Sequence, residues 1–208
     1  MKELYFIRHG QTEWNAIRRM QGQRNSNLTE LGRDQADING KLLSSLGIDY
    51  LVASPLDRTR QTADIINQHL ELEINYDDRI MEWHCGDWSG EMWDDVSKKW
   101  PEEFASWQED QFNYRGPNCE NYPDMFERTK PFLDEVLALN HKRTAVVSHG
   151  VIARAMVSSL LKHSTSEVFR YGQANDTIFH LTEDKESFSV QHFIRGDGPF
   201  GGLPPRNY

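Results

Sequence analysis

Short apolar runs of strand length alternate in this chain with longer segments of helical periodicity. Such runs lie at residues 4–7, 50–53 and 144–147, and amphipathic segments separate them. Two closing segments, TIFHLT and FSVQHFI, are also typical of strands. Strands that alternate with helices predict an α/β sheet covered on both faces, which binds ligands beyond the carboxyl ends of its strands.

Capping residues delimit two of the helices. The segment LTELGRDQADINGKLLSSLG predicts a helix with Thr29 as its N-cap and Gly47 just past its end. The expected buried face of this helix carries Leu31, Ile38, Leu42 and Leu46. After the next strand, Ser54 is expected at the N-cap, Pro55 at the first helical position and Asp57 at the third. That helix would start within two residues of the strand's end.

The rest of the chain continues the alternation. A strand is expected over LEINYDDRI, and helices over DMFERTKPFLDEVLALN, interrupted or kinked by Pro131, and over VIARAMVSSLL. The Gly/Pro-rich tail at 196–208 is expected to be irregular. A length of 208 residues with 38% hydrophobic residues is enough for one domain with a full core, which predicts a single domain over 1–208.

Charge and hydropathy exclude several classes of protein. No apolar stretch is long enough to span a bilayer and the first residues do not resemble a signal peptide, so a cytoplasmic protein without a membrane partner is expected. Cys85 and Cys119 lack a metal-binding spacing and fit a reducing compartment. A net charge of -9 argues against nucleic acid as a partner. Positive charge for an anionic ligand must therefore be concentrated locally.

Basic residues follow three of the predicted strands where each strand ends. Arg8 and His9 follow the first strand, Arg58 lies in the first helical turn after the second, and His149 and Gly150 follow the strand at 144–147. A single histidine or arginine at a strand end is usually structural or solvated. Three such coincidences at one sheet edge predict a shared site.

A cluster of arginines and histidines suits a phosphoryl group. The guanidinium fork matches phosphate oxygens, and a neutral imidazole adds a nucleophile. Phosphoryl transfer also needs a proton for the leaving oxygen. The stretch MEWHCGDWSG offers Glu82 and Asp87 as acids, and chemistry alone does not separate the two.

Five ordered motifs resemble the histidine phosphatase superfamily, which includes cofactor-dependent phosphoglycerate mutase and many small phosphatases. They are RHGQTEWN, LTELG, ASPLDRTRQTA, the pattern of Glu82, Gly86, Trp88 and Gly90, and VVSHGVIARA, over most of residues 4–155. The resemblance implies a phosphoglycerate mutase-like fold, a three-layer sandwich with a mostly parallel central sheet flanked by helices.

Carried over position by position, the resemblance implies site roles. His9 is the nucleophile and Glu82 the proton donor, which decides against Asp87 by analogy. The phosphate is bound by Arg8, Arg58 and His149. The pocket lining is expected to include Asn15, Gln21, the backbone of Gly22, and Gly150. A phosphohistidine mechanism of this kind implies no metal and no organic cofactor, because arginines take the part that magnesium plays in kinases.

The insertion at about 88–125 is the candidate determinant of the substrate. It is rich in tryptophan and is expected to form a lid, whose rings are mostly buried by its own helices. Trp83, beside the acid, is the ring expected to contact the leaving group. Nearby cations for a second anionic group are Lys98, Lys99 and Arg115, for which solvated surface is the better interpretation.

Two features of this region stay open. His84 and Cys85 look like a metal pair, but no further ligands accompany them at suitable spacing. The run PNCEN departs from the Gly-Gly-Glu-Ser run often seen in the family, which leaves the part played by Glu120 undecided.

The expected function is hydrolysis of a small phosphorylated metabolite through a phosphohistidine. The shortness of the chain and the lack of a clear second basic cluster favour a phosphomonoesterase. The alternatives are a phosphoglycerate-type mutase and a non-catalytic phospho-ligand binding module. Homodimers are common in the family, and no apolar stripe here can be assigned to an interface, so a homodimer stays open.

Overall fold

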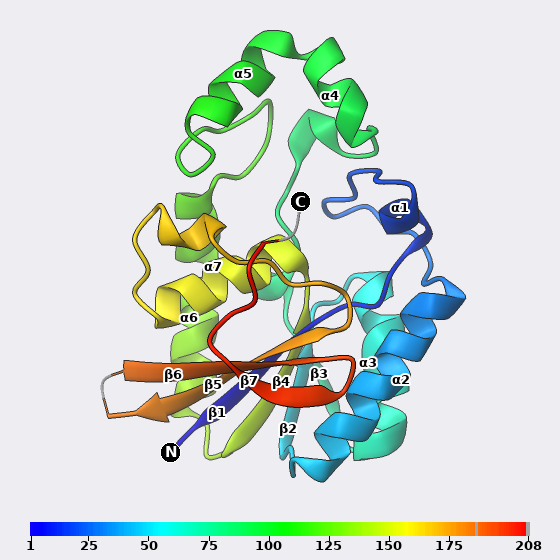
Figure 1. Cartoon of the computed structure of the whole chain (residues 1–208), viewed down its shortest axis with the longest axis vertical. Helices are drawn as coiled ribbons and strands as arrows, with labels where there is room; N and C mark the ends of the chain where they lie inside the picture. Colours follow the sequence, from blue (N-terminus) through cyan, green and yellow to red (C-terminus); the bar gives the residue numbers. More distant parts are fainter. Residues whose placement is uncertain (186, 207–208) are drawn as a thin grey trace.

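A seven-stranded sheet lies between two layers of helices (Figure 1). The computed structural model describes residues 1–185 and 187–206. The strands are β1 (Glu3–Arg8), β2 (Tyr50–Ala53), β3 (Ile74–Tyr76), β4 (Arg143–Ser148), β5 (Thr177–Asp184), β6 (Ser187–Ile194) and β7 (Asp197–Gly201). The helices are α1 (Glu13–Ala16), α2 (Glu30–Ser45), α3 (Asp57–Leu70), α4 (Trp93–Lys99), α5 (Pro101–Glu109), α6 (Tyr122–Ala138) and α7 (Gly150–Leu160).

The strand order is β3-β2-β4-β1-β5-β6-β7. β3, β2, β4 and β1 pair in parallel, whereas β5, β6 and β7 continue the sheet with antiparallel pairs. The predicted α/β sandwich with a parallel centre is therefore confirmed. Because β2, β4 and β1 are parallel neighbours, their carboxyl ends deliver the residues after them to one edge of the sheet.

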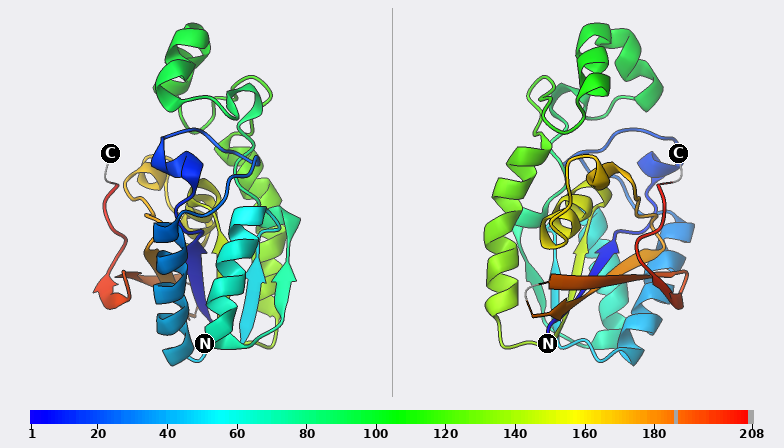
Figure 2. Two further views of the ribbon diagram at one scale, coloured as in Figure 1. Left: turned by 90° about the vertical axis from the view of Figure 1, so that its right-hand side faces the viewer. Right: turned by 60° about the vertical axis from the view of Figure 1, so that its left-hand side comes forward.

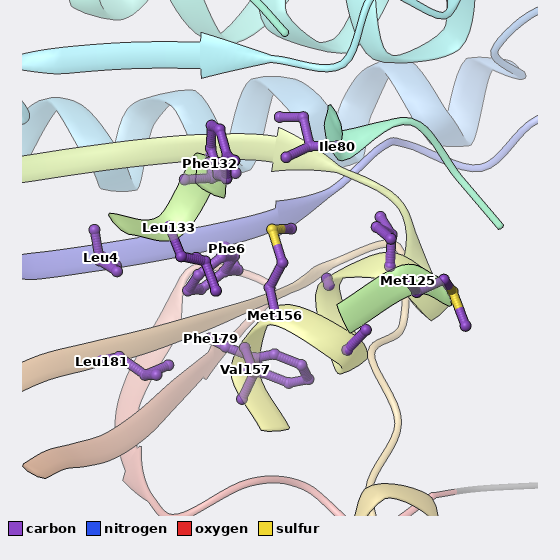
Figure 3. Close-up of a cluster of buried hydrophobic side chains, with 14 of the residues drawn as sticks. Leu4, Phe6, Ile80, Met125, Phe132, Leu133, Met156, Val157, Phe179 and Leu181 are labelled. Carbon is purple, nitrogen blue, oxygen red and sulfur yellow. The ribbon is translucent and has the colours of Figure 1, made fainter. Parts of the chain in front are cut away.

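Alternating residues of β1 enter two separate cores. Leu4 and Phe6 join the cluster under α6 and α7, which Figure 3 shows with Met156 and Phe179 beside Phe6. Tyr5 and Ile7 face the opposite layer, formed by α2 and α3. A strand buried on both faces in this way must be apolar throughout, as the run at 4–7 is.

α2 begins as predicted, because the side chain of Thr29 accepts a hydrogen bond from the N–H of Gly32 at 3.0 Å. The predicted apolar face was right for Leu42 and Leu46, which pack against the core, and wrong for Leu31 and Ile38, which are 52% and 38% exposed. The buried residues are Gly32, Ala36, Asn39, Gly40 and Leu43. Small residues face the core because α3 packs closely there; a Cβ on Gly40 would lie 2.5 Å from the ring of His69. A contact face of small residues gives a weak hydrophobic signal.

α3 begins later than predicted. Its N-cap is Leu56, which makes no side-chain cap, and its first residue is Asp57. Ser54 is not the cap because its hydroxyl lies 2.8 Å from Nε2 of His149. The residue that resembles a capping serine therefore belongs to the edge of the sheet where the predicted site residues gather.

Three other predicted segments differ from the structure. The strand predicted over LEINYDDRI covers only β3, since the carboxylate of Asp77 accepts the N–H of Arg79 at 2.8 Å and begins a short 3-10 turn at Asp78–Ile80. The tail predicted to be irregular contains β7, which pairs with β6. α6 runs through Pro131 without interruption.

α4 and α5 stand beyond the carboxyl ends of the strands, apart from the two main layers (Figures 1 and 2). They have a small core of their own around the fully buried Trp88, with Cys85, Val96 and Cys119. This segment therefore forms a compact unit above the edge where the predicted site residues gather. No helix in the described part of the chain is long and apolar enough to cross a membrane.

Candidate active site

His9 lies directly after β1, with its ring held at both nitrogens. The side chain is 3% exposed. Its Nδ1 lies 2.8 Å from the carbonyl oxygen of Gly10, which can only accept, so Nδ1 carries the proton. Nε2 consequently presents a lone pair, and Nε of Arg58 donates to it at 3.2 Å. The tautomer with a nucleophilic Nε2 is thus set by the backbone.

The turn after His9 packs backbone against backbone. The N–H of Gly10 donates to Oγ1 of Thr62 at 3.1 Å, and a Cβ on Gly10 would lie 2.1 Å from the carbonyl oxygen of Gly32. Only glycine fits at such a distance. Residue 10 therefore fixes the path of the loop after it.

The polar residues after Gly10 largely bind one another. Thr12 and Asn15 form a capping box at the start of α1. Nε2 of Gln21 donates to Oγ1 of Thr12 at 2.7 Å. Asn15, Gln21 and Gly22 all line the central cavity, where the resemblance puts them.

Arg58 is 1% exposed, and its guanidinium group donates hydrogen bonds to backbone carbonyl oxygens. Nη1 donates to the carbonyl of Arg24 and Nη2 to that of Gly22, both at 2.7 Å. The carbonyl of Gly22 therefore anchors the guanidinium. Burial lowers the pKa of Arg58 to about 10, although Glu82 raises it, so the group keeps its charge at neutral pH.

Arg8 lies beside His9 and also lines the cavity. Its Nη1 donates to the carbonyl of Gln173 at 2.7 Å. Gly150 packs behind it, and a Cβ there would lie 3.2 Å from Nε of Arg8. Gly150 is not among the residues that line the cavity, so the structure places it as a support for Arg8.

His149 lies behind His9 and not on the cavity wall. It is 0% exposed, and its ring meets that of His9 edge to face with centroids 5.2 Å apart. Within the described part of the chain, Nδ1 of His149 has no hydrogen-bond partner. A phosphoryl oxygen that reached this nitrogen would satisfy it.

Both buried imidazoles are held in the neutral form. Burial lowers the pKa of His9 well below its usual range, and the charges of Arg58 and Arg8 lower it further. Burial, followed by the charge of Arg58, lowers the pKa of His149 in the same way. A neutral His9 at physiological pH is the form that can act as a nucleophile.

Glu82 lines the same cavity and is held by backbone donors. Oε1 accepts the N–H groups of Trp83 at 2.9 Å and Ile152 at 3.0 Å, and Oε2 accepts that of Val151 at 3.3 Å. The N-terminus of α7 therefore orients the carboxyl group. The structure thus brings Arg8, His9, Arg58 and Glu82 to one cavity; Asp87 is not among its lining residues.

A second set of contacts, which sequence reasoning missed, holds the segment that carries Glu82. Arg128 on α6 binds both carboxylate oxygens of Glu120 at 2.8 Å, and its Nη1 donates to the carbonyls of Arg79 at 2.8 Å and Met81 at 3.0 Å. Glu120, whose part the sequence left open, also accepts the N–H of His84 at 2.8 Å. No sequence signal links these distant positions.

The cavity has a volume of about 250 Å³ and one aromatic side. Trp83 contributes to this side, as expected, and Trp93, Trp107 and Tyr114 contribute as well. The rings of the insertion are therefore not all buried in its own core. Trp83 is fixed by its Nε1, which donates to the carbonyl of Glu120 at 2.6 Å.

The three surface cations considered for a second anionic group lie elsewhere. Lys98 pairs with Asp95, Lys99 with Glu91 and Arg115 with Asp124, and none lines the cavity. The cavity is lined instead by Arg19, Arg154 and Arg206, which no sequence motif singled out. In the described residues, no three His, Cys, Asp or Glu side chains could together hold a metal ion.

Comparisons with known proteins agree with this geometry. A sequence model of the histidine phosphatase superfamily (branch 1) matches residues 4–195. Phosphoserine phosphatase 1 of Hydrogenobacter thermophilus is 36% identical over 186 residues, 88% of either chain. A probable phosphoglycerate mutase of Erwinia tasmaniensis is 37% identical over 165 residues, 77% of this chain and 75% of its own. A solved mycobacterial glucosyl-3-phosphoglycerate phosphatase has a TM-score of 0.83 at 28% identity, covering 91% of this chain and 97% of its own.

Proposed function

The chain belongs to branch 1 of the histidine phosphatase superfamily, and on this premise we propose that it hydrolyses a small phosphomonoester through a phosphohistidine at His9. One observation carries the proposal. A neutral imidazole with its lone pair on Nε2 shares a cavity with the buried guanidinium group of Arg58, the partly buried one of Arg8 and the carboxyl group of Glu82. Binding alone needs neither an attacking nitrogen nor an acid, which argues against a non-catalytic module.

In the first step, Nε2 of His9 attacks phosphorus and the ester oxygen leaves with a proton from Glu82. The N–H of Arg58 that now donates to Nε2 passes to a phosphoryl oxygen, which frees the lone pair and neutralises charge that develops in the transition state. Of the two carboxyl oxygens, Oε2 has the longer contact, 3.3 Å to a backbone N–H, so it is the oxygen that carries the proton.

In the second step, water attacks the phosphohistidine and gives its proton to Glu82. The N–P bond breaks, phosphate leaves, and His9 returns to its neutral tautomer with Nδ1–H on Gly10. The arginines supply the charge stabilisation throughout, so the proposal includes independence from metal ions. Turnover that persists in excess chelator tests this part.

A mutase is the second candidate, because one relative is named a probable phosphoglycerate mutase. A mutase must keep water from the phosphohistidine until the phosphoryl group returns to substrate. It would depend on a bisphosphate and release little phosphate.

The decisive experiment is a p-nitrophenyl phosphate assay of the wild type and of His9→Ala, with a search for acid-labile phosphoprotein. Hydrolysis that is lost in His9→Ala, together with a phosphohistidine in the wild type, supports the phosphatase. Bisphosphate-dependent transfer with little free phosphate would select the mutase. Phosphate binding without turnover in the wild type would support the non-catalytic binding module instead.

A cytoplasmic location belongs to the same proposal. Cys85 and Cys119 are both free thiols, which suits a reducing compartment. Cell fractionation tests the location, and light scattering decides between a monomer and the homodimer that the sequence leaves open.

A further inference from the structure

Three arginines line the cavity in addition to the two expected to bind phosphate. Arg19 follows α1, Arg154 lies on α7, and Arg206 belongs to the segment after β7. They come from three separate parts of the chain. The mechanism proposed above uses none of them.

The guanidinium group of Arg154 has few hydrogen-bond partners in the described part of the chain. Its Nη1 donates to the hydroxyl of Tyr122 at 3.1 Å, and its Nε is buried without a hydrogen-bond partner in the described part of the chain. Among the same residues, no carboxylate lies within ion-pair distance of it. Arg154 also lies near Arg8, whose pKa is lowered by burial, raised by the charge of Glu82 and lowered by the charge of Arg154. Two neighbouring guanidinium groups repel each other unless an anion lies between or beside them.

Arg19 resembles Arg154 in this respect. Its guanidinium lies over the ring of Trp14 at 5.2 Å, and its Nε is buried without a partner in the residues described. A buried N–H without a partner is costly in a folded protein and often points to an unseen ligand.

The chain end brings Arg206 to the same cavity by backbone pairing. The N–H of Gly172 donates to the carbonyl of Pro204 at 3.3 Å, and the N–H of Arg206 donates to the carbonyl of Arg170 at 3.2 Å. Tyr171 and Pro205 form an isolated bridge between these contacts. Figure 1 shows this red segment running from β7 toward the end of the sheet where the strands have their carboxyl ends.

The charge of the cavity exceeds what one phosphoryl group can balance. Even without Arg206, four arginines line it, against Glu82 and Glu120, and Glu120 is already paired with Arg128. This excess occurs in a chain whose net charge is -9. A phosphoryl dianion between Arg8 and Arg58 would leave a positive potential in the rest of the cavity, which favours a second anionic group.

We propose that Arg19, Arg154 and Arg206 form a second anion subsite, which binds a carboxylate on the alcohol part of the substrate. The inference rests on the proposed function and deepens it. The planar fork of arginine matches a carboxylate, and a cavity of about 250 Å³ suits a small acid ester of phosphate. The sequence shows no clear second basic cluster, because these three arginines lie far apart along the chain and only the fold brings them to one cavity.

The test uses two esters that differ by the carboxylate alone, O-phosphoserine and O-phosphoethanolamine. The wild type is expected to show a kcat/KM about tenfold or more higher for O-phosphoserine, since a charge-assisted hydrogen bond is worth about that factor. In Arg154→Met and in Arg206→Met, that ratio is expected to fall toward one. Arg33→Met, which changes an exposed arginine outside the cavity, should keep the wild-type ratio.

Each outcome decides a different point. Equal kcat/KM for the two esters in the wild type overturns the subsite while leaving the phosphatase intact. A ratio that stays high in both folded variants, as judged by circular dichroism, also overturns it. Absence of turnover with both of these esters and with p-nitrophenyl phosphate contradicts the proposed function itself. If Arg154→Met does not fold, Arg206→Met decides, because its segment joins the loop at 170–172 by few contacts.

Discussion

The Nε–H of Arg58 donates to Nε2 of His9 at 3.2 Å, so the most buried cation of the site rests on the lone pair that must attack phosphorus. The contact disfavours a proton on Nε2, because a protonated Nε2 would turn one N–H toward another. It also fixes the orientation of the imidazole ring relative to the guanidinium group. In the proposed mechanism, Arg58 therefore acts first on the nucleophile and then on the phosphoryl group.

Replacement of Arg58 by methionine should reduce kcat/KM by a factor of about 10² to 10³, the size usually found when one stabilising donor is removed from a transition state. Arg58→Lys should not recover this loss, because an ammonium cannot reach Nε2 of His9 and the carbonyls of Gly22 and Arg24 together. Steady-state kinetics with p-nitrophenyl phosphate measure both. A lysine variant with wild-type activity would contradict the role of the guanidinium geometry.

The pH dependence of activity should reflect the lowered pKa of His9. Protonation of His9 removes the nucleophile, and burial with the charges of Arg58 and Arg8 lowers its pKa well below the ordinary 6.5. Loss of kcat/KM on the acid side should therefore begin below pH 6.5. In Arg58→Met this limb should move to higher pH, since a positive neighbour has been removed. An acid limb that stays in place in the variant would exclude His9 as its source.

Stability should fall as the pH drops below about 6.5. Histidines in the unfolded chain take up protons near this pH, whereas buried His9 and His149 stay neutral until the pH is much lower. The unfolded state then binds more protons, so the free energy of unfolding decreases between about pH 6.5 and pH 5. Urea unfolding at several pH values measures the slope, which His149→Gln should reduce. The exposed His84→Gln is the matched control.

Arg128→Met should impair the positioning of the acid without removing it. Arg128 clamps Glu120 and the carbonyls on either side of residue 80, so its loss frees the segment that carries Glu82. We expect kcat for an alkyl phosphate to fall by a factor of about 10, at the lower end of general-acid effects. The fall should be smaller for p-nitrophenyl phosphate, whose leaving group departs without a proton. Equal losses on both substrates would indicate a general structural defect, and Lys130→Met on the same helix should cause neither.

Trp83→Ala should change substrate preference more than stability. Trp83 lines the cavity but is not among the fully buried rings, unlike Trp88. Removal of one wall of the leaving-group pocket should lower kcat/KM for aryl phosphates relative to small alkyl phosphates by a factor of about 5, as one aromatic contact is worth about 1 kcal/mol. A panel of both classes, with thermal unfolding alongside, measures the two effects. An unchanged preference would reject the expected contact.

Residues that end strands were predictable, because parallel neighbouring strands direct their carboxyl ends to one edge of the sheet. Arg8, His9 and Arg58 meet for this reason. The choice of Glu82 over Asp87 as the acid, by contrast, depended on the family resemblance, because the chemistry of the two carboxyl groups did not separate them. Ser54 shows the limit of local patterns: a serine before Pro55 resembles a helix cap, yet the structure gives its hydroxyl to His149.

The distant contacts could not be read from the sequence. Arg154 and Arg206 are 52 residues apart and meet only after the chain has returned from β7. The clamp between Glu120 and Arg128 depends in the same way on how α6 lies beside the turn at residue 80. Local propensity carries no information on such pairs. The two misplaced leucine and isoleucine positions on α2 have another cause, because α3 packs so closely against α2 that only small residues fit between the two helices.

The pairing of residues 204–206 with the loop at 170–172 bears on how the enzyme is handled at the bench. A purification handle fused beyond Arg206 would follow a segment that lines the cavity. Met1, by contrast, is 84% exposed and precedes β1 at the opposite end of the sheet (Figure 1). Recombinant protein intended for kinetics should therefore carry its tag at the amino terminus.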